Sequence, residues 1–299
     1  MRSRTIDVDG PLHFADFGGS GPTIVLVHGL GGSHVNWMAV GPALAARARV
    51  VAPDLAGFGR TPLAGRSARV HANRELLDRF LDAVADGPAI LIGNSMGGLI
   101  AMMEAARRPA KVARLVLVGP AQPRPPATLV DPMVALTLAA YALPGVGETL
   151  MRWRATRLGP EGLVRQTLAF CCADSACLPP EVLAAHVAMA RERQMMPWAH
   201  AAFLEAARSI MAVLARRRRM QAMIAEIEAP ALIVQGTEDR LVPLAASRAT
   251  VASRRDWSLA VFEGVGHVPQ LEAPERFVET VVEWLDGQRR GAVGPGGGR

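Results

Sequence analysis

Apolar, β-branched runs without polar alternation recur along the chain, and short segments of helical periodicity separate them. Continuous runs of this kind are typical of strands that are buried on both faces of a sheet. Six such runs follow two β-rich pieces at the start, so strands are predicted at Thr5–Val8, Leu12–Phe17, Thr23–Val27, Val50–Ala52, Ala89–Ile92, Leu115–Val118, Leu232–Val234 and Leu259–Phe262. Helices are predicted at Trp37–Ala48, His71–Ala85, Met96–Arg108, Leu244–Ser253 and Pro274–Leu285. The alternation predicts an α/β fold with a mostly parallel, eight-stranded sheet and helices on both faces.

One long segment, residues 121–227, interrupts this alternation. It has no convincing strand, and its helical patterns lie at Pro132–Leu143, Glu148–Leu158, Glu161–Phe170, Glu181–Met195, Trp198–Ala215 and Met220–Ile227. We interpret this segment as a helical cap inserted into a core domain formed by residues 1–120 and 228–288. The Gly-rich end, residues 289–299, is predicted to be a disordered tail.

The composition agrees with one large α/β unit that carries an insertion. The chain has 299 residues, of which 50% are hydrophobic and 20% are charged, so it can bury a sizeable core. No apolar run is long enough to cross a bilayer, and Asp7 precedes any apolar run that could serve as a signal peptide. The three cysteines do not form a disulfide framework or a paired zinc motif. We therefore expect a cytoplasmic protein without a stable membrane insertion and without a bound metal.

The net charge of +6 comes mainly from arginine, and one run, Arg216–Arg219, concentrates it. Basic residues interleaved with aromatic residues, as in nucleic-acid-binding motifs, are not found, so no nucleic-acid partner is expected. A solvated helix face explains the arginine run most simply. Attraction to anionic lipid or to an acidic partner is the alternative.

A candidate nucleophile lies directly after a predicted strand. Gly93-Asn94-Ser95-Met96-Gly97 has the G-x-S-x-G spacing, and a helical pattern begins at once behind it. A sharp strand-to-helix turn exposes the serine hydroxyl, and side chains at the two glycines would collide with such a turn. This context favours Ser95 as a nucleophile over a glycine-rich helix start that merely packs closely.

A serine hydroxyl requires a base, and a histidine base requires a carboxylate that fixes its tautomer. His267 follows the last predicted strand, at the sheet edge where α/β proteins place ligand groups. Asp239 follows the strand Leu232–Val234, and its rivals are Glu238 and Asp131. The resulting order of nucleophile, acid and base differs from the orders of the two best-known serine protease groups.

An oxyanion hole is predicted beside the nucleophile. His28-Gly29-Leu30-Gly31-Gly32 follows the strand Thr23–Val27, and its glycines permit close approach of the backbone to a substrate oxygen. The backbone N–H groups of Leu30 and Met96 are the expected donors. A purely structural glycine turn is the alternative.

Together these segments resemble the α/β-hydrolase superfamily, in particular its esterase and carbon–carbon-bond hydrolase branch with a helical cap. The matching pieces are the segments around His28, Ser95, Asp239 and His267 and the segment Asp54–Thr61. The resemblance implies hydrolysis without metal or organic cofactor and a pocket between cap and sheet. Branches that use an aspartate nucleophile are set aside because Ser95 occupies that position.

The expected activity is that of a carboxylesterase-like serine hydrolase acting on a small to medium, mostly apolar ester. Candidate pocket residues are His28, Gly29, Trp153, Met196, Trp198 and Val268. An arginine of the cap that held a substrate carboxylate would favour an alternative: carbon–carbon cleavage of a vinylogous diketone. The candidates, which exposed helix faces explain most simply, are Arg152, Arg154, Arg157, Arg165, Arg191 and Arg193. A ligand-binding protein with little turnover is a further alternative, and a homo-oligomer is compatible with the pattern.

Overall fold

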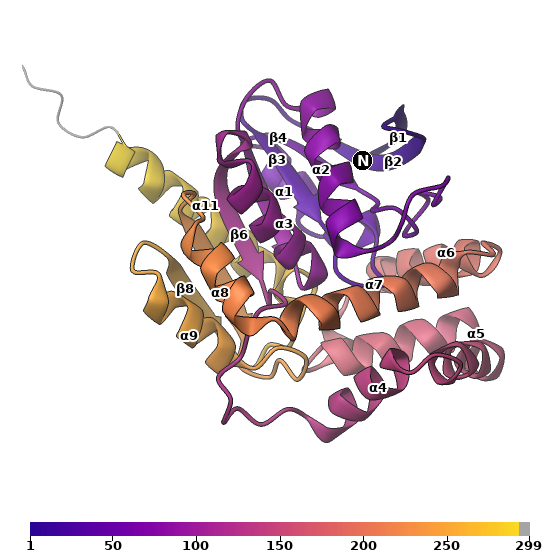
Figure 1. The fold of residues 1–299 in the computed structure, drawn as a ribbon. Coiled ribbons are helices and arrows are strands. Elements are labelled where there is room, and N and C mark those ends of the chain that lie inside the picture. The colour runs from indigo at the N-terminus through magenta and orange to yellow at the C-terminus, as the bar shows by residue number, and fades with distance from the viewer. Residues whose placement is uncertain (293–299) are drawn as a thin grey trace, which may run out of the picture.

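A computed structural model describes the backbone of residues 1–292 and the side chains of residues 1–288. Its centre is an eight-stranded sheet with the strand order β1-β2-β4-β3-β5-β6-β7-β8 (Figure 1). The strands are β1 Arg2–Asp7, β2 Pro11–Gly18, β3 Thr23–Val27, β4 Arg49–Pro53, β5 Ala89–Asn94, β6 Val112–Val118, β7 Ala231–Gly236 and β8 Ser258–Phe262. The first two pairings, β1 with β2 and β2 with β4, are antiparallel, and the strands from β4 to β8 are parallel. The mostly parallel sheet predicted from the sequence is therefore confirmed.

Apolar layers cover both faces of the sheet, so the central strands β3, β5 and β7 are buried along their whole length. One layer contains side chains from α2 (Val70–Val84), α3 (Met96–Arg107) and α8 (Arg217–Ala225). The other contains side chains from α1 (Gly41–Ala45) and α11 (Pro274–Ala292). The helix α9 (Leu244–Ser253) lies beside β7 and β8.

The segment between β6 and β7 is helical. Its helices are α4 Pro132–Ala142, α5 Val146–Cys171, α6 Pro180–Gln194 and α7 Ala199–Leu214, followed by α8, with a short 3₁₀ turn at Ser175–Cys177. Figure 1 shows α4 to α7 gathered across one end of the sheet. Gly159 has φ 63° and precedes Pro160, so α5 is kinked there. This kink separates the two helices that the sequence predicted on either side of Gly159.

The helices of the structure differ from the predicted ones at three places. The predicted helix Trp37–Ala48 is divided into a 3₁₀ turn, His34–Trp37, and the short α1, because Ser33 caps the turn and Pro42 starts the helix. A four-residue helix, α10 Pro269–Glu272, was not predicted. The last helix continues to Ala292, past the start of the tail predicted for 289–299; residues 293–299 of that prediction lie outside the described residues.

A buried carboxylate lies on α3, the helix that follows Ser95. Glu104 is fully buried, one oxygen lies 3.2 Å from the Arg74 guanidinium, and the other has no partner among the described side chains. Burial and the nearby Asp78 carboxylate raise the pKa of Glu104 from 4.5 to about 7, although Arg74 opposes this shift.

Glu104→Gln is expected to change how stability depends on pH. Between pH 4.5 and 7 the native state holds a proton that the unfolded chain has released, so raising the pH through this range destabilises the native protein. The melting temperature of the wild type should therefore fall relative to that of Glu104→Gln between pH 5 and 8, by about 2–4 °C per kcal/mol. Thermal unfolding measured at several pH values tests this. The exposed Glu279→Gln on α11 is the control, and parallel curves for wild type and Glu104→Gln would contradict the prediction.

Candidate active site

The predicted nucleophile Ser95 lies in the turn between β5 and α3 with φ 54° and ψ −113°. This conformation is rare for a residue with a side chain, and it needs close packing around the turn. A Cβ atom at Gly93 would come within 2.5 Å of the Gly97 oxygen, and a Cβ atom at Gly97 would come within 2.1 Å of the Val27 oxygen. Both glycines of the motif are therefore sterically required.

Hydrogen bonds to β6 and to the segment behind it hold the Ser95 backbone. Its N–H donates to the Val118 oxygen at 2.9 Å, and its oxygen accepts from the Ala121 N–H at 3.0 Å. The Ser95 side chain is half-buried, and its hydroxyl has no hydrogen-bond partner among the described residues. Hydrogen bonds thus fix the Ser95 main chain, whereas none of the described residues fixes its hydroxyl.

The predicted base and acid form a buried pair. His267 Nδ1 lies 2.7 Å from Asp239 Oδ2. The same oxygen accepts from Gln235 Nε2 at 2.7 Å, and Oδ1 accepts from the backbone N–H groups of Leu241 and Val242 at 2.9 and 2.8 Å. Gln235, Leu241 and Val242 all donate to the Asp239 carboxylate, and a carboxylate accepts hydrogen bonds without donating any. The hydrogen bond between Asp239 and His267 must therefore be donated by the imidazole. Nδ1 therefore carries the proton, and Nε2 is left as the acceptor.

Strand ends bring this pair next to the serine turn. Asn94 Nδ2 donates to the Val118 oxygen at 3.0 Å and to the His267 oxygen at 3.1 Å. A Cβ atom at Gly119 would lie 2.9 Å from His267 Nδ1 and 3.0 Å from Asp239 Oδ2. The structure thus places all three predicted residues at the carboxyl edge of β5 to β8. The hydrogen bond between the Ser95 hydroxyl and His267 is not formed in this arrangement.

The two predicted oxyanion donors belong to segments next to the serine. Met96 is the first residue of α3, and Leu30 follows Gly29, whose Cβ position lies 3.3 Å from Ser95 Cβ. Neither backbone N–H has an acceptor among the described residues. Unpaired N–H groups at a helix start and in a glycine loop can bind an anionic oxygen.

His28, a predicted pocket residue, is instead a buried support for this loop. Its Nε2 accepts from the Leu55 N–H at 3.0 Å, so Nδ1 carries the proton and donates to the Gly29 oxygen at 2.8 Å. Burial lowers the pKa of His28 from 6.5 to about 4, which keeps the ring neutral. Because both nitrogens are occupied and the ring is fully buried, His28 offers a ligand no polar contact.

The remaining pocket candidates lie in different environments. Trp153 is exposed on α5, with 59% of its surface accessible. Met196 and Trp198 are half-buried, and the buried indole N–H of Trp198 has no partner among the described residues. Val268 is buried beside His267 and packs in a small cluster with Leu168 of α5. Val268 therefore lies where the cap meets the histidine loop, whereas Trp153 faces away from the protein.

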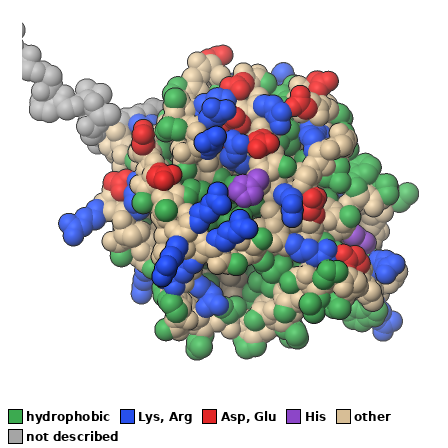
Figure 2. Space-filling view, viewed as in Figure 1, with side chains coloured by type: hydrophobic (Ala, Val, Ile, Leu, Met, Phe, Trp, Pro, Cys, Tyr) green, Lys and Arg blue, Asp and Glu red, His purple; other side chains and the backbone are tan. Residues whose placement is uncertain are grey.

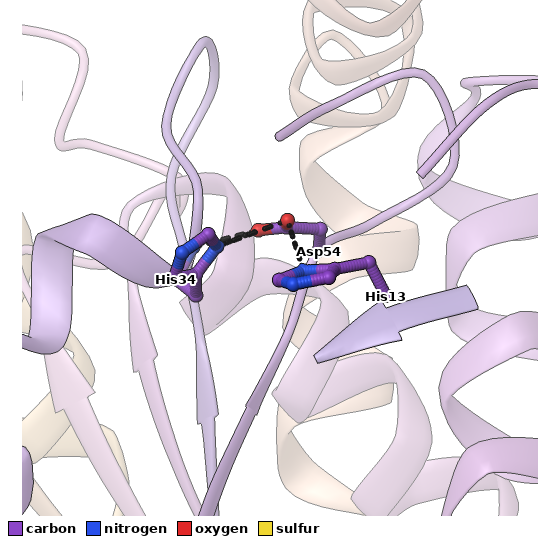
Figure 3. A group of neighbouring side chains, drawn as sticks. All are labelled: His13, His34 and Asp54. Atoms are coloured by element: carbon purple, nitrogen blue, oxygen red, sulfur yellow. Dashed lines mark hydrogen bonds and ion pairs between the residues drawn. The ribbon is translucent and has the colours of Figure 1, made fainter. Parts of the chain in front are cut away.

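One group of metal-type ligands occurs among the described residues, formed by His13, His34 and Asp54 (Figure 3). Asp54 accepts from His13 Nδ1 at 2.8 Å, from His34 Nδ1 at 3.0 Å, and from the backbone N–H groups of His34 and Arg60 at 2.7 and 2.9 Å. Burial alone would raise the pKa of Asp54, but the two imidazole hydrogen bonds lower it well below its usual range. Asp54 is thus the centre of a buried hydrogen-bond network that joins β2, the 3₁₀ turn and the loop after β4.

Sequence reasoning missed the contacts that attach the histidine loop to the cap. The His267 N–H donates to the Cys171 oxygen at 2.6 Å. Glu272 accepts from the Gly266 N–H at 3.0 Å and from the Ala173 N–H at 2.7 Å. Burial raises the pKa of Glu272, although these backbone hydrogen bonds oppose the shift. Glu272 lies five residues after His267 in the sequence, but spacing alone gives no sign of a partner as distant in sequence as Ala173.

Comparison with known proteins identifies the family. A model of the α/β hydrolase fold matches residues 22–274, so the chain belongs to the α/β hydrolase family. It is 32% identical over 259 residues to a pimeloyl-[acyl-carrier protein] methyl ester esterase of Aromatoleum aromaticum, covering 85% of this chain and 94% of that protein. It is 27% identical over 293 residues to a 2-hydroxy-6-oxononadienedioate/2-hydroxy-6-oxononatrienedioate hydrolase of Dechloromonas aromatica, covering 95% and 94%.

A solved structure agrees with this assignment. The meta-cleavage product hydrolase CumD of Pseudomonas fluorescens superposes with a TM-score of 0.70 at 26% identity, covering 93% of this chain and 95% of that one. Family and relatives together support hydrolase chemistry. The fold and the resemblance to α/β-hydrolases that were inferred from the sequence are confirmed.

Glu272→Gln is expected to loosen the junction between cap and histidine loop. An amide can accept only one of the two N–H groups and presents its own N–H₂ to the other, which weakens a pair of charge-assisted hydrogen bonds. Cys172 is buried in this junction and Cys177 is exposed, so slow thiol labelling reports local opening. The slow labelling rate should rise about tenfold, corresponding to about 1.4 kcal/mol.

The control is Glu275→Gln, an exposed carboxylate close by in sequence. A slow labelling rate in Glu272→Gln equal to that of the wild type and of Glu275→Gln would show that Glu272 does not hold the junction.

Proposed function

We propose that this protein is a serine hydrolase that cleaves a small to medium, mostly apolar carboxylic ester through an acyl-enzyme on Ser95. The observation that carries the proposal is the convergence of the strained Ser95 turn with the buried His267–Asp239 pair at one sheet edge. The esterase named among the relatives acts on a methyl ester, which supports ester chemistry for this chain.

The proposed first half-reaction forms the acyl-enzyme. Ser95 Oγ attacks the ester carbonyl carbon, and its proton passes to His267 Nε2. Asp239 keeps the Nδ1 proton in place and stabilises the imidazolium. The Leu30 and Met96 N–H groups receive the oxyanion, an interaction worth roughly 3 kcal/mol per donor. As the carbon–oxygen bond breaks, the alcohol leaves with the proton from His267.

The second half-reaction releases the acid. His267 takes a proton from water, the hydroxide attacks the acyl carbon, and the Ser95 oxygen leaves with the proton that His267 returns. This cycle needs the Ser95 side chain to turn towards Nε2. Neither the Ser95 hydroxyl nor His267 Nε2 has a hydrogen-bond partner among the residues that the structure describes, which is compatible with that rotation.

A second candidate is hydrolysis of a carbon–carbon bond in a vinylogous diketone, with the same three residues. Several relatives are named for dienoate and dienedioate hydrolysis, and their substrates are acids. The cap places a half-buried cation at its contact with the core. Arg193 of α6 lies over the Phe58 ring, and its guanidinium donates to the Gly57 oxygen at 3.0 Å. Burial lowers the pKa of Arg193 to about 10, so it remains charged at neutral pH.

Substrate preference and the nucleophile can be tested together. Wild type should hydrolyse p-nitrophenyl esters of short to medium chain length faster than a ring-fission vinylogous diketone. Ser95→Ala should lose roughly 10⁴-fold or more of the esterase kcat/KM, while the exposed Ser253→Ala retains it. A preference for the diketone by orders of magnitude would support the second candidate. A folded wild type that neither turns over nor reacts with a fluorophosphonate at Ser95 would reject both and favour a ligand-binding protein.

The pH dependence of kcat/KM is expected to follow the neutral form of His267. Only a neutral imidazole can accept the Ser95 proton, so the rate should fall towards acid pH. The profile of an activated ester between pH 5 and 9 measures this, with stability controlled by circular dichroism at each pH. A flat profile would argue against His267 as the base.

A further inference from the structure

The outer side of the cap exposes an unusually large number of apolar side chains. We call it the cap apolar face; its members are Leu129, Met133, Leu136, Leu143, Val146 and Trp153. Leu129 is 91% exposed, Leu136 66% and Trp153 59%. In Figure 2 hydrophobic side chains gather along the lower edge, where Figure 1 places α4. Contiguous exposed apolar surface of this kind marks an interaction site in soluble proteins.

The helix α4 cannot be explained as an ordinary surface helix. From Pro132 to Gly147 the chain has no charged residue. A helix that is apolar on every side is normally buried, yet within α4 only Val134 and Tyr141 are. The apolar side of α4 that faces away from the protein therefore has no partner in the part of the chain that the structure describes.

A shallow groove continues the face around the corner between α4 and α5. It is lined by Pro144, Gly145, Val146, Thr149, Leu150 and Trp153. No single helix in the described part of the chain meets the length and apolarity of a membrane span; α4 and α5 meet it only as a pair, and they are bent by 114°. The geometry is that of an apolar corner, not of a spanning helix.

The charges around this corner are positive. Arg152 and Arg157 flank Trp153, are exposed, and have no ion-pair partner among the described residues. The nearby acids are occupied. Asp131 accepts from the Met133 and Val134 N–H groups, and Glu148 is paired with Arg208.

We propose that the cap apolar face docks on an anionic phospholipid surface. Leucine, methionine and valine side chains would enter the upper acyl region, and Trp153 would lie at the headgroup level, where indole rings are favoured. Arg152 and Arg157 would meet lipid phosphates, since cationic side chains near an anionic lipid surface are attracted to it. The proposal does not depend on the proposed catalytic activity.

Charge favours this occupant over a second copy of the chain. A symmetric dimer through the same face would bring Arg152 and Arg157 of both copies towards one another, without a free carboxylate to offset them. An anionic lipid surface neutralises the same guanidinium groups. The net charge of +6 acts in the same direction.

Co-sedimentation of the full chain with vesicles tests the proposal. Phosphatidylcholine vesicles are compared with vesicles that also contain phosphatidylglycerol, at low and at high salt. Wild type should bind the anionic vesicles at low salt, and high salt should weaken that binding. Leu136→Glu and Arg152→Glu should each reduce the bound fraction at least about fivefold. Because both positions are exposed, their melting temperatures should match that of the wild type.

Arg218→Glu is the matched charge reversal on α8, inside the arginine run that the sequence offered as an alternative lipid site, and it should retain binding. Three results would overturn the proposal. The wild type could fail to bind either vesicle. Binding could be lost in Arg218→Glu and kept in Leu136→Glu. Sedimentation velocity could show a wild-type dimer that Leu136→Glu converts to a monomer, which would assign the face to a second copy.

Discussion

The strained backbone at Ser95 is the constraint on which the site depends. A positive φ at a residue with a side chain costs of the order of 1–3 kcal/mol and persists only where its surroundings enforce it. Here β6 and the chain beyond it enforce it, through the hydrogen bonds with Val118 and Ala121. The absence of a Cβ atom at Gly97 lets α3 begin against the Val27 oxygen. Interior strands of a parallel sheet thus provide the rigidity that the turn itself lacks.

Two buried hydrogen-bond networks hold the loops around this turn. Asp54 ties together β2, the 3₁₀ turn and the loop after β4, and His28 ties the glycine loop to Leu55. A buried carboxylate with donors on every side, or a neutral imidazole with both nitrogens paired, stabilises only one arrangement of its neighbours, because each unmade hydrogen bond would leave a buried polar group unsatisfied. Asp54 and His28 are residue types that often act in catalysis. Here their hydrogen-bonding atoms are already paired with neighbouring loops, so they hold those loops in place.

The strands, and the positions of Ser95, Asp239 and His267 behind strand ends, could be deduced from the sequence because they depend on local signals. Uninterrupted β-branched runs predict buried strands, and parallel strands bring their carboxyl ends to one edge. The roles of His28 and Glu272 could not be deduced, since they depend on Leu55 and Ala173, which only the folded chain brings near. The division of the predicted helix at Trp37 arose from a cap at Ser33, a local hydrogen bond that outweighs periodicity.

Hydrogen bonds connect the cap to the histidine loop at two places. The helix α5 begins at the cap apolar face and ends at Cys171, whose oxygen accepts from the His267 N–H. Glu272 adds a second connection at the same end, through Ala173 and Gly266. The kink at Gly159 lies between these two ends and divides α5 into an outer and an inner segment. Only the inner segment ends at the His267 loop, so the hydrogen bond from His267 to Cys171 depends on that segment, whereas Val146 and Trp153 of the cap apolar face belong to the outer one.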